Sequence, residues 1–292
     1  MTRTDDGAAR ASAAGPLGDL TAAFEAASGR LRPFHGRLRA LESVASTNDE
    51  AARLAAAGAP EGTVVVADTQ TAGRGRSGRS WFSPPGAGVY VSVVLRPWAG
   101  DGPEPAGWLR LITLAAGVAV ADGIRAASGL PAELKWPNDV GVTNGHAPRA
   151  ADRSWRKLAG ILAEGAAVGS AVPHVIIGIG INVRQAALPA PLAATATSIE
   201  AESGRVIDRG AVLVETLAAL RATYEDLRRG RAADVLARWR ALSPTATGAH
   251  VVYQGEGGER EGVTAGLDDQ GALRVRSGAR IETIVSGEVK WI

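Results

Sequence analysis

The stretch TQTAGRGRSGRSWFSPPG, residues 69–86, interleaves arginines with closely spaced glycines ahead of a Trp-Phe pair and a double proline. Gly73, Gly75 and Gly78 match the GxGxxG pattern of dinucleotide-binding folds, and residues 73–80 come close to a P-loop. Both folds need a helix directly after the glycines, because the phosphates sit at the helix N-terminus. The Ser-Pro-Pro-Gly run at 83–86 prevents such a helix. The stretch therefore predicts a cationic loop for an anionic ligand with an adenine-like ring, the plainer alternative being a solvated surface turn.

Strand and helix patterns continue on both sides of this loop. Apolar and β-branched runs predict strands at 38–44, 62–69, 89–96, 132–136, 140–143, 158–164 and 174–183. Apolar residues at helical spacing predict helices at 21–28, 46–57, 108–128, 208–229 and 232–242. After residue 247, short strands alternate with Gly-rich turns, which is typical of a small β-barrel. The order of elements indicates an α+β fold, with helices on one side of a mixed β-sheet and the barrel at the end.

The chain of 292 residues is long enough for one large domain with a small companion. Residues 1–35 are expected to be a disordered N-terminal segment, because small and polar residues dominate its beginning. Residues 36–244 then form the main domain, and residues 245–292 form the barrel. The run NGHAPRAADRSW at 144–155 is expected to be an over-long hairpin tip.

Composition excludes several classes of function. The formal net charge is only +2, which argues against a nucleic-acid or membrane surface. The absence of cysteine excludes disulfides, thiol nucleophiles and thiolate metal sites, and it agrees with a cytoplasmic location. The four histidines have no metal-ligand spacing. We expect no membrane span and no secretory signal, because no segment reads as a sufficiently long apolar run.

Four short motifs accompany the arginine loop along the chain: STN at 46–48, KWPND at 135–139, KLAGILAE at 157–164 and GIGINV at 178–183. Together with GRGRSGRSW they resemble the biotin–protein ligases, enzymes that make biotinyl-5′-adenylate from biotin and ATP and then transfer biotin to a lysine of a carrier protein. The resemblance runs from residue 41 to residue 292; each motif alone is weak, but their joint occurrence in this order is specific. It implies a class II synthetase-like catalytic domain at 36–244 and an SH3-like barrel at 245–292.

The resemblance places biotin between the STN segment and the loop. Ser46, Thr47, Asn48 and Gln70 would surround the ureido head, whose polar ring needs hydroxyl and amide partners. Gly160 would let the backbone approach biotin closely. Without the resemblance, the plain interpretation of the STN segment is a helix N-cap.

The resemblance also implies that Arg74, Gly75 and Arg76 cover biotin and the adenylate, with Arg79 as a further phosphate ligand. Their charge would favour attack of the biotin carboxylate on the α-phosphorus, a step in which we expect Arg76 to act directly. Trp81 matches the aromatic residue that packs on adenine, although from the residues alone a core anchor is equally expected.

Lys157 matches the lysine implied to contact the biotin carboxylate and the reacting phosphate, where a mobile point cation suits shifting charge. Asp139 is the candidate that deprotonates or orients the carrier lysine. Alternatively, Asp139 and Asn138 help to hold Mg²⁺ on the phosphates of ATP, since no metal cage of protein side chains alone is expected. Asn182 would reach the nucleotide. Lysine is scarce in the chain, so Lys135, Lys157 and Lys290 stand out.

Several alternatives remain open. Some members of the family carry an N-terminal winged helix-turn-helix, but residues 1–35 contain no basic recognition helix, so we expect neither DNA binding nor repressor activity. A related ligase for lipoate or octanoate is the nearest rival, and the polar cluster around Gln70 favours the ureido ring of biotin. A phosphate-binding module without catalysis is the blandest alternative. The expected partner is a biotin carboxyl carrier domain, and we expect a monomer or a weak homodimer.

Overall fold

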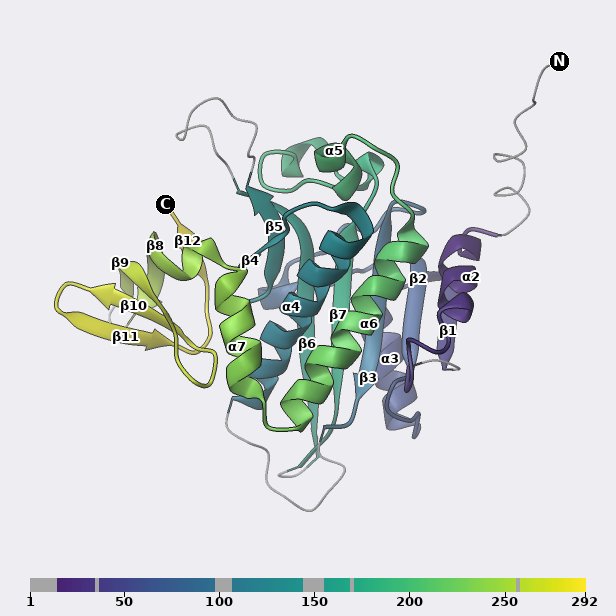
Figure 1. The fold of residues 1–292 in the computed structure, drawn as a ribbon, viewed down its shortest axis with the longest axis horizontal. Coiled ribbons are helices and arrows are strands. Elements are labelled where there is room, and N and C mark those ends of the chain that lie inside the picture. The colour runs from purple at the N-terminus through teal and green to yellow at the C-terminus, as the bar shows by residue number, and fades with distance from the viewer. Residues whose placement is uncertain (1–14, 35–36, 98–106, 144–154, 169–170, 256–257) are drawn as a thin grey trace.

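A computed structural model describes residues 15–34, 37–97, 107–143, 155–168, 171–255 and 258–292 (Figure 1). Seven strands form the main sheet: β1 (Leu38–Val44), β2 (Val64–Gln70), β3 (Gly88–Leu95), β4 (Glu133–Lys135), β5 (Asp139–Thr143), β6 (Trp155–Val168) and β7 (Ala171–Asn182). Their order is β1-β2-β3-β7-β6-β5-β4. Strands β1 and β2 are parallel and all other neighbours are antiparallel, so the predicted mixed sheet is confirmed.

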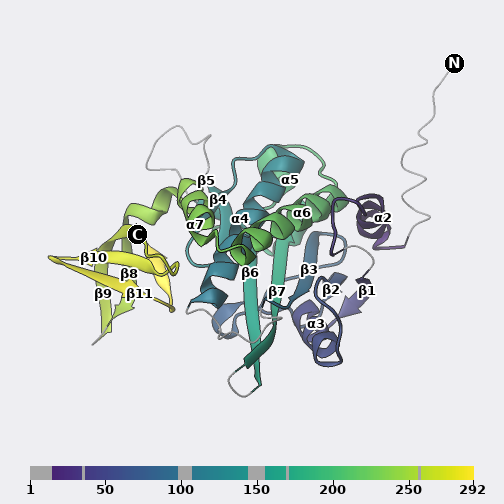
Figure 2. The same ribbon diagram turned by 60° about the horizontal axis from the view of Figure 1, so that its bottom comes forward.

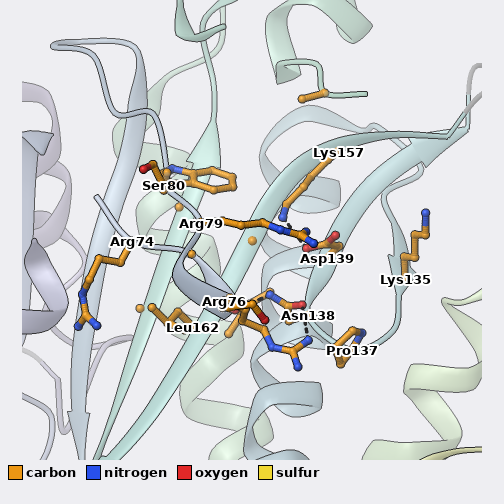
Figure 3. A pocket seen from close by; sticks show the side chains of 18 of the residues that line it. Arg74, Arg76, Arg79, Ser80, Lys135, Pro137, Asn138, Asp139, Lys157 and Leu162 are labelled. Atoms are coloured by element: carbon orange, nitrogen blue, oxygen red, sulfur yellow. Dashed lines mark hydrogen bonds and ion pairs between the residues drawn. The ribbon is translucent and has the colours of Figure 1, made fainter. Parts of the chain in front are cut away.

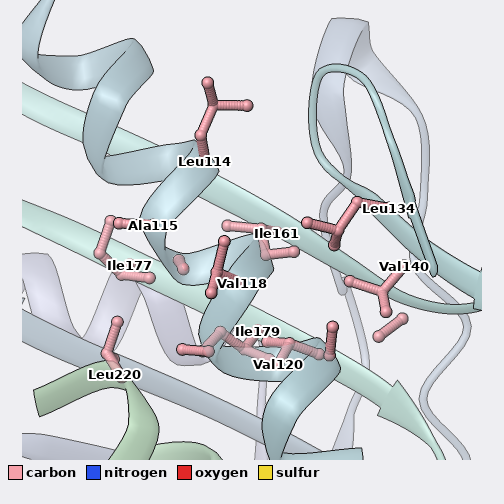
Figure 4. Packing of buried hydrophobic residues seen from close by; sticks show 14 of the residues in the cluster. Leu114, Ala115, Val118, Val120, Leu134, Val140, Ile161, Ile177, Ile179 and Leu220 are labelled. Atoms are coloured by element: carbon pink, nitrogen blue, oxygen red, sulfur yellow. The ribbon is translucent and has the colours of Figure 1, made fainter. Parts of the chain in front are cut away.

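Helices α4 (Trp108–Ser128), α6 (Arg209–Arg228) and α7 (Ala232–Ala241) cover one face of this sheet (Figures 1 and 2). Their apolar side chains join the main core, in which α4 packs against Ile161, Ile177 and Ile179 (Figure 4). Contrary to expectation, α4 is long and apolar enough to cross a membrane, with a mean hydropathy of 1.4. Since 72% of its most apolar window is buried, its composition is that of a core helix.

Helix α3 (Thr47–Ala56) corrects the prediction that all helices lie on one side. Its Ala51 and Ala55 pack against Val65, Val94 and Ile176 in a second apolar cluster. Successive strand residues point to opposite faces, and Val64 and Val66 belong to the main core. Helix α3 therefore lies on the face opposite α4 and α6, and it leaves the rest of that face open for a site.

The N-terminal segment is also more ordered than expected. Helix α2 (Gly18–Ala26) lies beside α6, and Leu20, Phe24, Leu31 and Phe34 are buried in the main core. The prediction of a disordered segment is therefore wrong for residues 15–34, because the few large apolar side chains of this segment are buried in the main core. Residues 1–14 lie outside the described part of the chain, as do residues 144–154 of the predicted hairpin tip.

Five antiparallel strands follow α7: β8 (Thr247–Gly255), β9 (Gly258–Leu267), β10 (Leu273–Ser277), β11 (Arg280–Ile284) and β12 (Val289–Trp291). They form one sheet in the order β11-β10-β9-β8-β12. Hydrogen bonds are among the contacts that fasten this C-terminal sheet to the main domain: Trp136 Nε1 donates to Gly271 O at 3.0 Å, and Arg110 Nε donates to Gln270 O at 2.9 Å. A short helix that no sequence pattern predicted, α5 (Ile199–Ser203), lies between β7 and α6 in the chain.

Candidate active site

A cavity of about 590 Å³ opens on the face of the main sheet that α4 and α6 do not cover. Alternation along β7 creates its floor, because Ile177 and Ile179 point into the helical core while Gly178 and Gly180 face the cavity. Every predicted site residue lines it: Ser46, Thr47, Asn48, Gln70, Arg74, Gly75, Arg76, Arg79, Trp81, Asn138, Asp139, Lys157, Gly160 and Asn182. Residues spread over some 140 positions of the sequence thus share one pocket.

One end of the pocket is a buried polar cluster at the start of α3. The Thr47 amide and hydroxyl donate to Gln70 Oε1 at 2.9 and 3.1 Å. The Ser92 hydroxyl lies 2.8 Å from Thr47 Oγ1 and 2.6 Å from Asn48 Oδ1. Ser46 occupies the N-cap position of α3, but its side chain makes no capping hydrogen bond. Ser46 is therefore the N-cap residue by position, but its hydroxyl does not cap the helix and is available to a ligand.

Asn48 ties this polar end to the pocket floor. Its Nδ2 donates to Glu164 Oε2 at 2.6 Å and to Leu162 O at 3.3 Å. A Cβ added to Gly178 would lie only 2.1 Å from Asn48 Oδ1. Glycine at this position is thus what lets the amide lie flat against β7.

Trp81 covers the middle of the floor. A Cβ on Gly180 would lie 2.4 Å from its Nε1, and one on Gly160 would lie 3.1 Å from its Cζ3. The indole Nε1 is buried and has no hydrogen-bond partner among the described residues. The ring therefore rests directly on two glycines of β6 and β7, where bulkier residues would displace it.

The arginine loop is a small hairpin above this floor. The Gly75 amide donates to Arg79 O at 2.6 Å, and the Trp81 amide donates to Gly73 O at 2.8 Å. The guanidinium of Arg74 bonds Glu164 and Asp49 at 2.7 Å, so it points away from Arg76 and Lys157 (Figure 3).

The other two loop arginines differ in their partners. Arg79 pairs with Glu288 of the C-terminal segment. Arg76 donates to the neutral Asn138 Oδ1 at 3.2 Å, and burial lowers its pKa although Asp139 opposes this. Of the three predicted phosphate ligands, Arg76 is the one with no carboxylate within salt-bridge distance in the described structure.

A lysine–carboxylate pair stands opposite the loop. Lys157 Nζ lies 2.5 Å from Asp139 Oδ1 and 5.2 Å from the centre of the Trp81 ring. Pairing between β5 and β6 places Asp139 across from Gly160, and Asn138 Nδ2 donates to Ile161 O at 2.8 Å. Both charges are about three-quarters buried, which strengthens their attraction relative to a surface pair. Asn182 is buried at the end of β7, where its Nδ2 donates to Thr197 O at 3.1 Å.

Comparison with known proteins agrees with this geometry. Residues 40–182 match the Biotin/lipoate A/B protein ligase family, and residues 248–290 match the biotin protein ligase C-terminal domain. The bifunctional ligase/repressor BirA of Bacillus spizizenii is 37% identical over 249 residues, which cover 85% of this chain and 71% of that protein. The chain belongs to the biotin/lipoate ligase family.

Two further relatives match this ligase-family chain over most of their length. The biotin--[acetyl-CoA-carboxylase] ligase of Mycobacterium tuberculosis is 37% identical over 259 residues, covering 87% of this chain and 88% of that protein. The structure of the biotin protein ligase from Aquifex aeolicus in complex with biotin and ATP superposes with a TM-score of 0.72. Its sequence identity is 29%, over 88% of this chain and 99% of the other.

Sequence reasoning missed part of the pocket of this ligase-family chain. Gly178 and Gly180 could have been found, because alternating glycines in an otherwise isoleucine-rich strand indicate a close approach on one face. Residues 287–291 of the C-terminal sheet also line the pocket, and so does Trp155 at the start of β6. Only the docking of the two sheets brings residues 287–291 to the site, whereas Trp155 belongs to the main sheet and lies two residues before Lys157 on β6.

The side chains of the pocket could bind a magnesium ion only together with the phosphates of a substrate. The described residues contain no group of three or more His, Cys, Asp or Glu side chains that could hold a metal. Asp139 and Glu288 are the acidic side chains in the lining, and both are paired with cations. Mg²⁺ commonly binds one or two carboxylates together with substrate phosphates, so Asp139 and Asn138 fit such an ion.

Proposed function

We propose that the protein is an ATP-dependent biotin–protein ligase, which activates biotin as biotinyl-5′-adenylate and transfers it to a lysine of a biotin carboxyl carrier domain. The observation that carries this proposal is one pocket that joins a buried polar cluster, a lysine–carboxylate pair and an indole on a glycine floor. Those three parts match, in order, a ureido ring, a reacting carboxylate with its phosphate, and a purine base.

The polar end would hold the head of biotin. The Ser46 hydroxyl can donate to the ureido oxygen, and the remaining lone pair of the Thr47 hydroxyl can accept from a ureido nitrogen. Gln70 Oε1 already accepts from the Thr47 amide and hydroxyl, so it orients that hydroxyl. An alkyl chain such as that of octanoate would leave these buried groups unpaired, at a cost of roughly 1–3 kcal/mol per group. This argument favours biotin over lipoate or octanoate as the substrate.

The cations in the middle would serve the first half-reaction. An oxygen of the biotin carboxylate attacks the α-phosphorus of ATP, and the bond from that phosphorus to the β-phosphate oxygen breaks, which releases pyrophosphate. Arg76 and Lys157 lie on opposite sides of Asp139 and Asn138, so they can contact the two anions that must meet. Their charges would offset the repulsion and stabilise the transition state. The Trp81 ring would pack on adenine, with Asn182 near the nucleotide.

Asp139 would serve the second half-reaction. The carrier lysine must lose a proton before its amine attacks the carbonyl carbon of the adenylate and releases AMP. The Asp139 carboxylate uses one oxygen for Lys157 and can accept a proton from, or orient, the incoming ammonium with the other. Mg²⁺ bound with ATP would neutralise phosphate charge, and Asp139 and Asn138 are the residues that would hold it.

We further propose that the protein acts in the cytoplasm, as a monomer or weak homodimer without DNA binding. In support, helix α2 packs into the core of the main domain instead of forming part of a separate DNA-binding module. An electrophoretic mobility shift with operator-like DNA would test this point.

Transfer of radiolabelled biotin to a carrier domain, with ATP and Mg²⁺, tests the main proposal. We expect label on the carrier with wild-type protein and its loss with Lys157→Ala. Parallel reactions with lipoate and octanoate, read by mass spectrometry of the carrier, should show no modification. Modification by lipoate but not by biotin would overturn the proposed substrate.

A further inference from the structure

All three lysines of the chain line the same pocket. The sequence contains 29 arginines but only Lys135, Lys157 and Lys290 as lysines, and each of the three belongs to the pocket lining. At every other basic position the charge is carried by arginine. An ammonium is a compact charge with rotatable donors, whereas a guanidinium is a rigid fork, so the two are not interchangeable at a site where charge moves. Lys157 has a role in the proposed function, whereas Lys135 and Lys290 have none so far.

Some of the cationic side chains that line the pocket are paired with carboxylates, and others are not. Arg74 pairs with Glu164 and Asp49, Arg79 pairs with Glu288, and Lys157 pairs with Asp139. Within the described residues, neither Lys135 nor Lys290 has a carboxylate within salt-bridge distance. Together with Arg76, these two lysines are therefore the pocket cations still able to neutralise a bound anion.

Lys135 is held in a fixed position beside the reacting groups. Strand β4 pairs Lys135 directly with Asp139 of β5, so the two side chains lie on the same face of the sheet. Its ammonium lies 4.6 Å from the centre of the Trp291 ring and 4.9 Å from that of Trp155. Figure 3 shows Lys135 on the opposite side of Asp139 from Arg79. The two indoles thus fix a cation at the outer end of the pocket.

Burial makes this cation receptive to an anion. Desolvation lowers the pKa of Lys135, and the nearby Lys157 lowers it further, while Asp139 opposes both. A partly buried ammonium without a carboxylate is poorly solvated, so it gains more from a bound phosphate than a surface lysine would.

Lys290 comes from the other domain. It lies on β12, next to Trp291, and its side chain is exposed. Glu288, two residues earlier, pairs with Arg79 of the loop. The C-terminal strand therefore brings Lys290 to the rim of the pocket.

We propose that Lys135 and Lys290 form the subsite for the β- and γ-phosphates of ATP, the part that leaves as pyrophosphate. This inference rests on the proposed ligase function. When the biotin oxygen bonds to the α-phosphorus, the bond to the bridging oxygen breaks and its electron pair departs with pyrophosphate. Ammonium groups at the outer end of the pocket stabilise that added charge, while Arg76 and Lys157 act at the α-phosphorus.

The test compares Lys290→Met and Lys135→Met with a matched control, Arg221→Met, which removes an exposed cation from α6 outside the pocket. Calorimetry with inorganic pyrophosphate alone and with biotin alone would give two dissociation constants for each protein. For either lysine variant we expect a pyrophosphate dissociation constant about tenfold higher, since a charge-assisted hydrogen bond is lost. The biotin dissociation constant should stay within about twofold, and Arg221→Met should change neither.

Lys290→Met is the decisive variant because an exposed side chain can be shortened without disturbing the fold, whereas Lys135→Met alters the contact with two indoles. Lys135→Arg, which keeps the charge between the rings, should retain most of the pyrophosphate affinity. An unchanged pyrophosphate dissociation constant for Lys290→Met, or an equal loss of biotin affinity, would overturn the subsite.

Failure of this inference and failure of the proposed function have different signatures. If wild-type protein biotinylates a carrier but Lys290→Met binds pyrophosphate normally, the subsite is wrong and the function stands. If pyrophosphate binds through both lysines but no carrier is labelled with biotin, the subsite stands and the function is wrong.

Discussion

Gly178→Ala should disconnect the polar end of the pocket from its floor. The added Cβ would lie 2.1 Å from Asn48 Oδ1, whereas ordinary contact begins at 3.4 Å, so the amide must retreat by about 1.3 Å. That movement breaks the 2.6 Å hydrogen bonds of Asn48 with Ser92 and Glu164. With each such bond contributing roughly 0.5–1.5 kcal/mol, the loss is about 1–3 kcal/mol. Part of it should appear as weaker biotin binding, because the cluster is no longer preorganised.

Isothermal titration calorimetry with biotin would measure this change. The whole of this free energy would correspond to a rise of about 5- to 150-fold in the dissociation constant, so we expect an increase of at least severalfold within that limit. Gly29→Ala is the matched control, since a Cβ there would meet nothing within 4 Å. In an Asn48→Ala background the clash disappears, so Gly178→Ala should add little. Wild-type affinity for Gly178→Ala, or an equal cost in the Asn48→Ala background, would refute the steric argument.

Two further predictions concern the pocket, and a third concerns the ion pair between Asp19 and Arg209. Asp139→Asn should slow transfer from preformed biotinyl-adenylate about 10²- to 10⁴-fold in a single-turnover assay while adenylation falls less, and equal losses would contradict a role in the second step. Trp81→Ala should raise the KM for ATP about 5- to 100-fold in pyrophosphate exchange, since stacking on a base contributes roughly 1–3 kcal/mol; an unchanged KM would exclude the indole as the adenine platform. Burial tends to raise the pKa of Asp19, but its hydrogen bond and ion pair with Arg209 hold that pKa below its usual 3.8. The stability that Asp19 contributes is therefore present above pH 3.8 and lost as pH falls through the lower folded value, so urea unfolding of wild type and Asp19→Asn should converge in acid.

Local sequence determined most elements of the main domain. Strand β1 and helix α4 begin and end at the predicted residues, because alternation and helical spacing are properties of short segments. The motif residues also predicted the lining, and Lys157, Asp139 and Trp81 all face one pocket. Chemistry of this kind can be inferred from sequence because each motif supplies its own donor or charge.

Local sequence patterns could not predict which side chains and helices of this chain contact one another. All three loop arginines were expected near the adenylate, yet Arg74 is held by Glu164 and Arg79 by Glu288, 90 and 209 residues away in the chain. A short helix was predicted at residues 21–28, but its sequence did not show that it would pack against α6, where Phe24 is buried in the main core. Ion pairing and burial depend on which surfaces meet, and that depends on the packing of the whole chain.

The sequence by itself determined that strands, helices and a biotin-ligase set of motifs are present, because periodicity and residue chemistry act over a few positions. The alternation of isoleucine and glycine along β7 is a property of the sequence, but the tertiary structure decided that α4 and α6 cover the isoleucine face and that the site lies over the glycine face. It also decided that the Trp291 ring lies against Lys135 and that Lys290 lines the same pocket, because only the docking of the two sheets brings β12 to the site. Bringing distant segments together costs conformational entropy, which the burial of apolar surface in the whole core offsets. These contacts therefore exist only once the chain has folded.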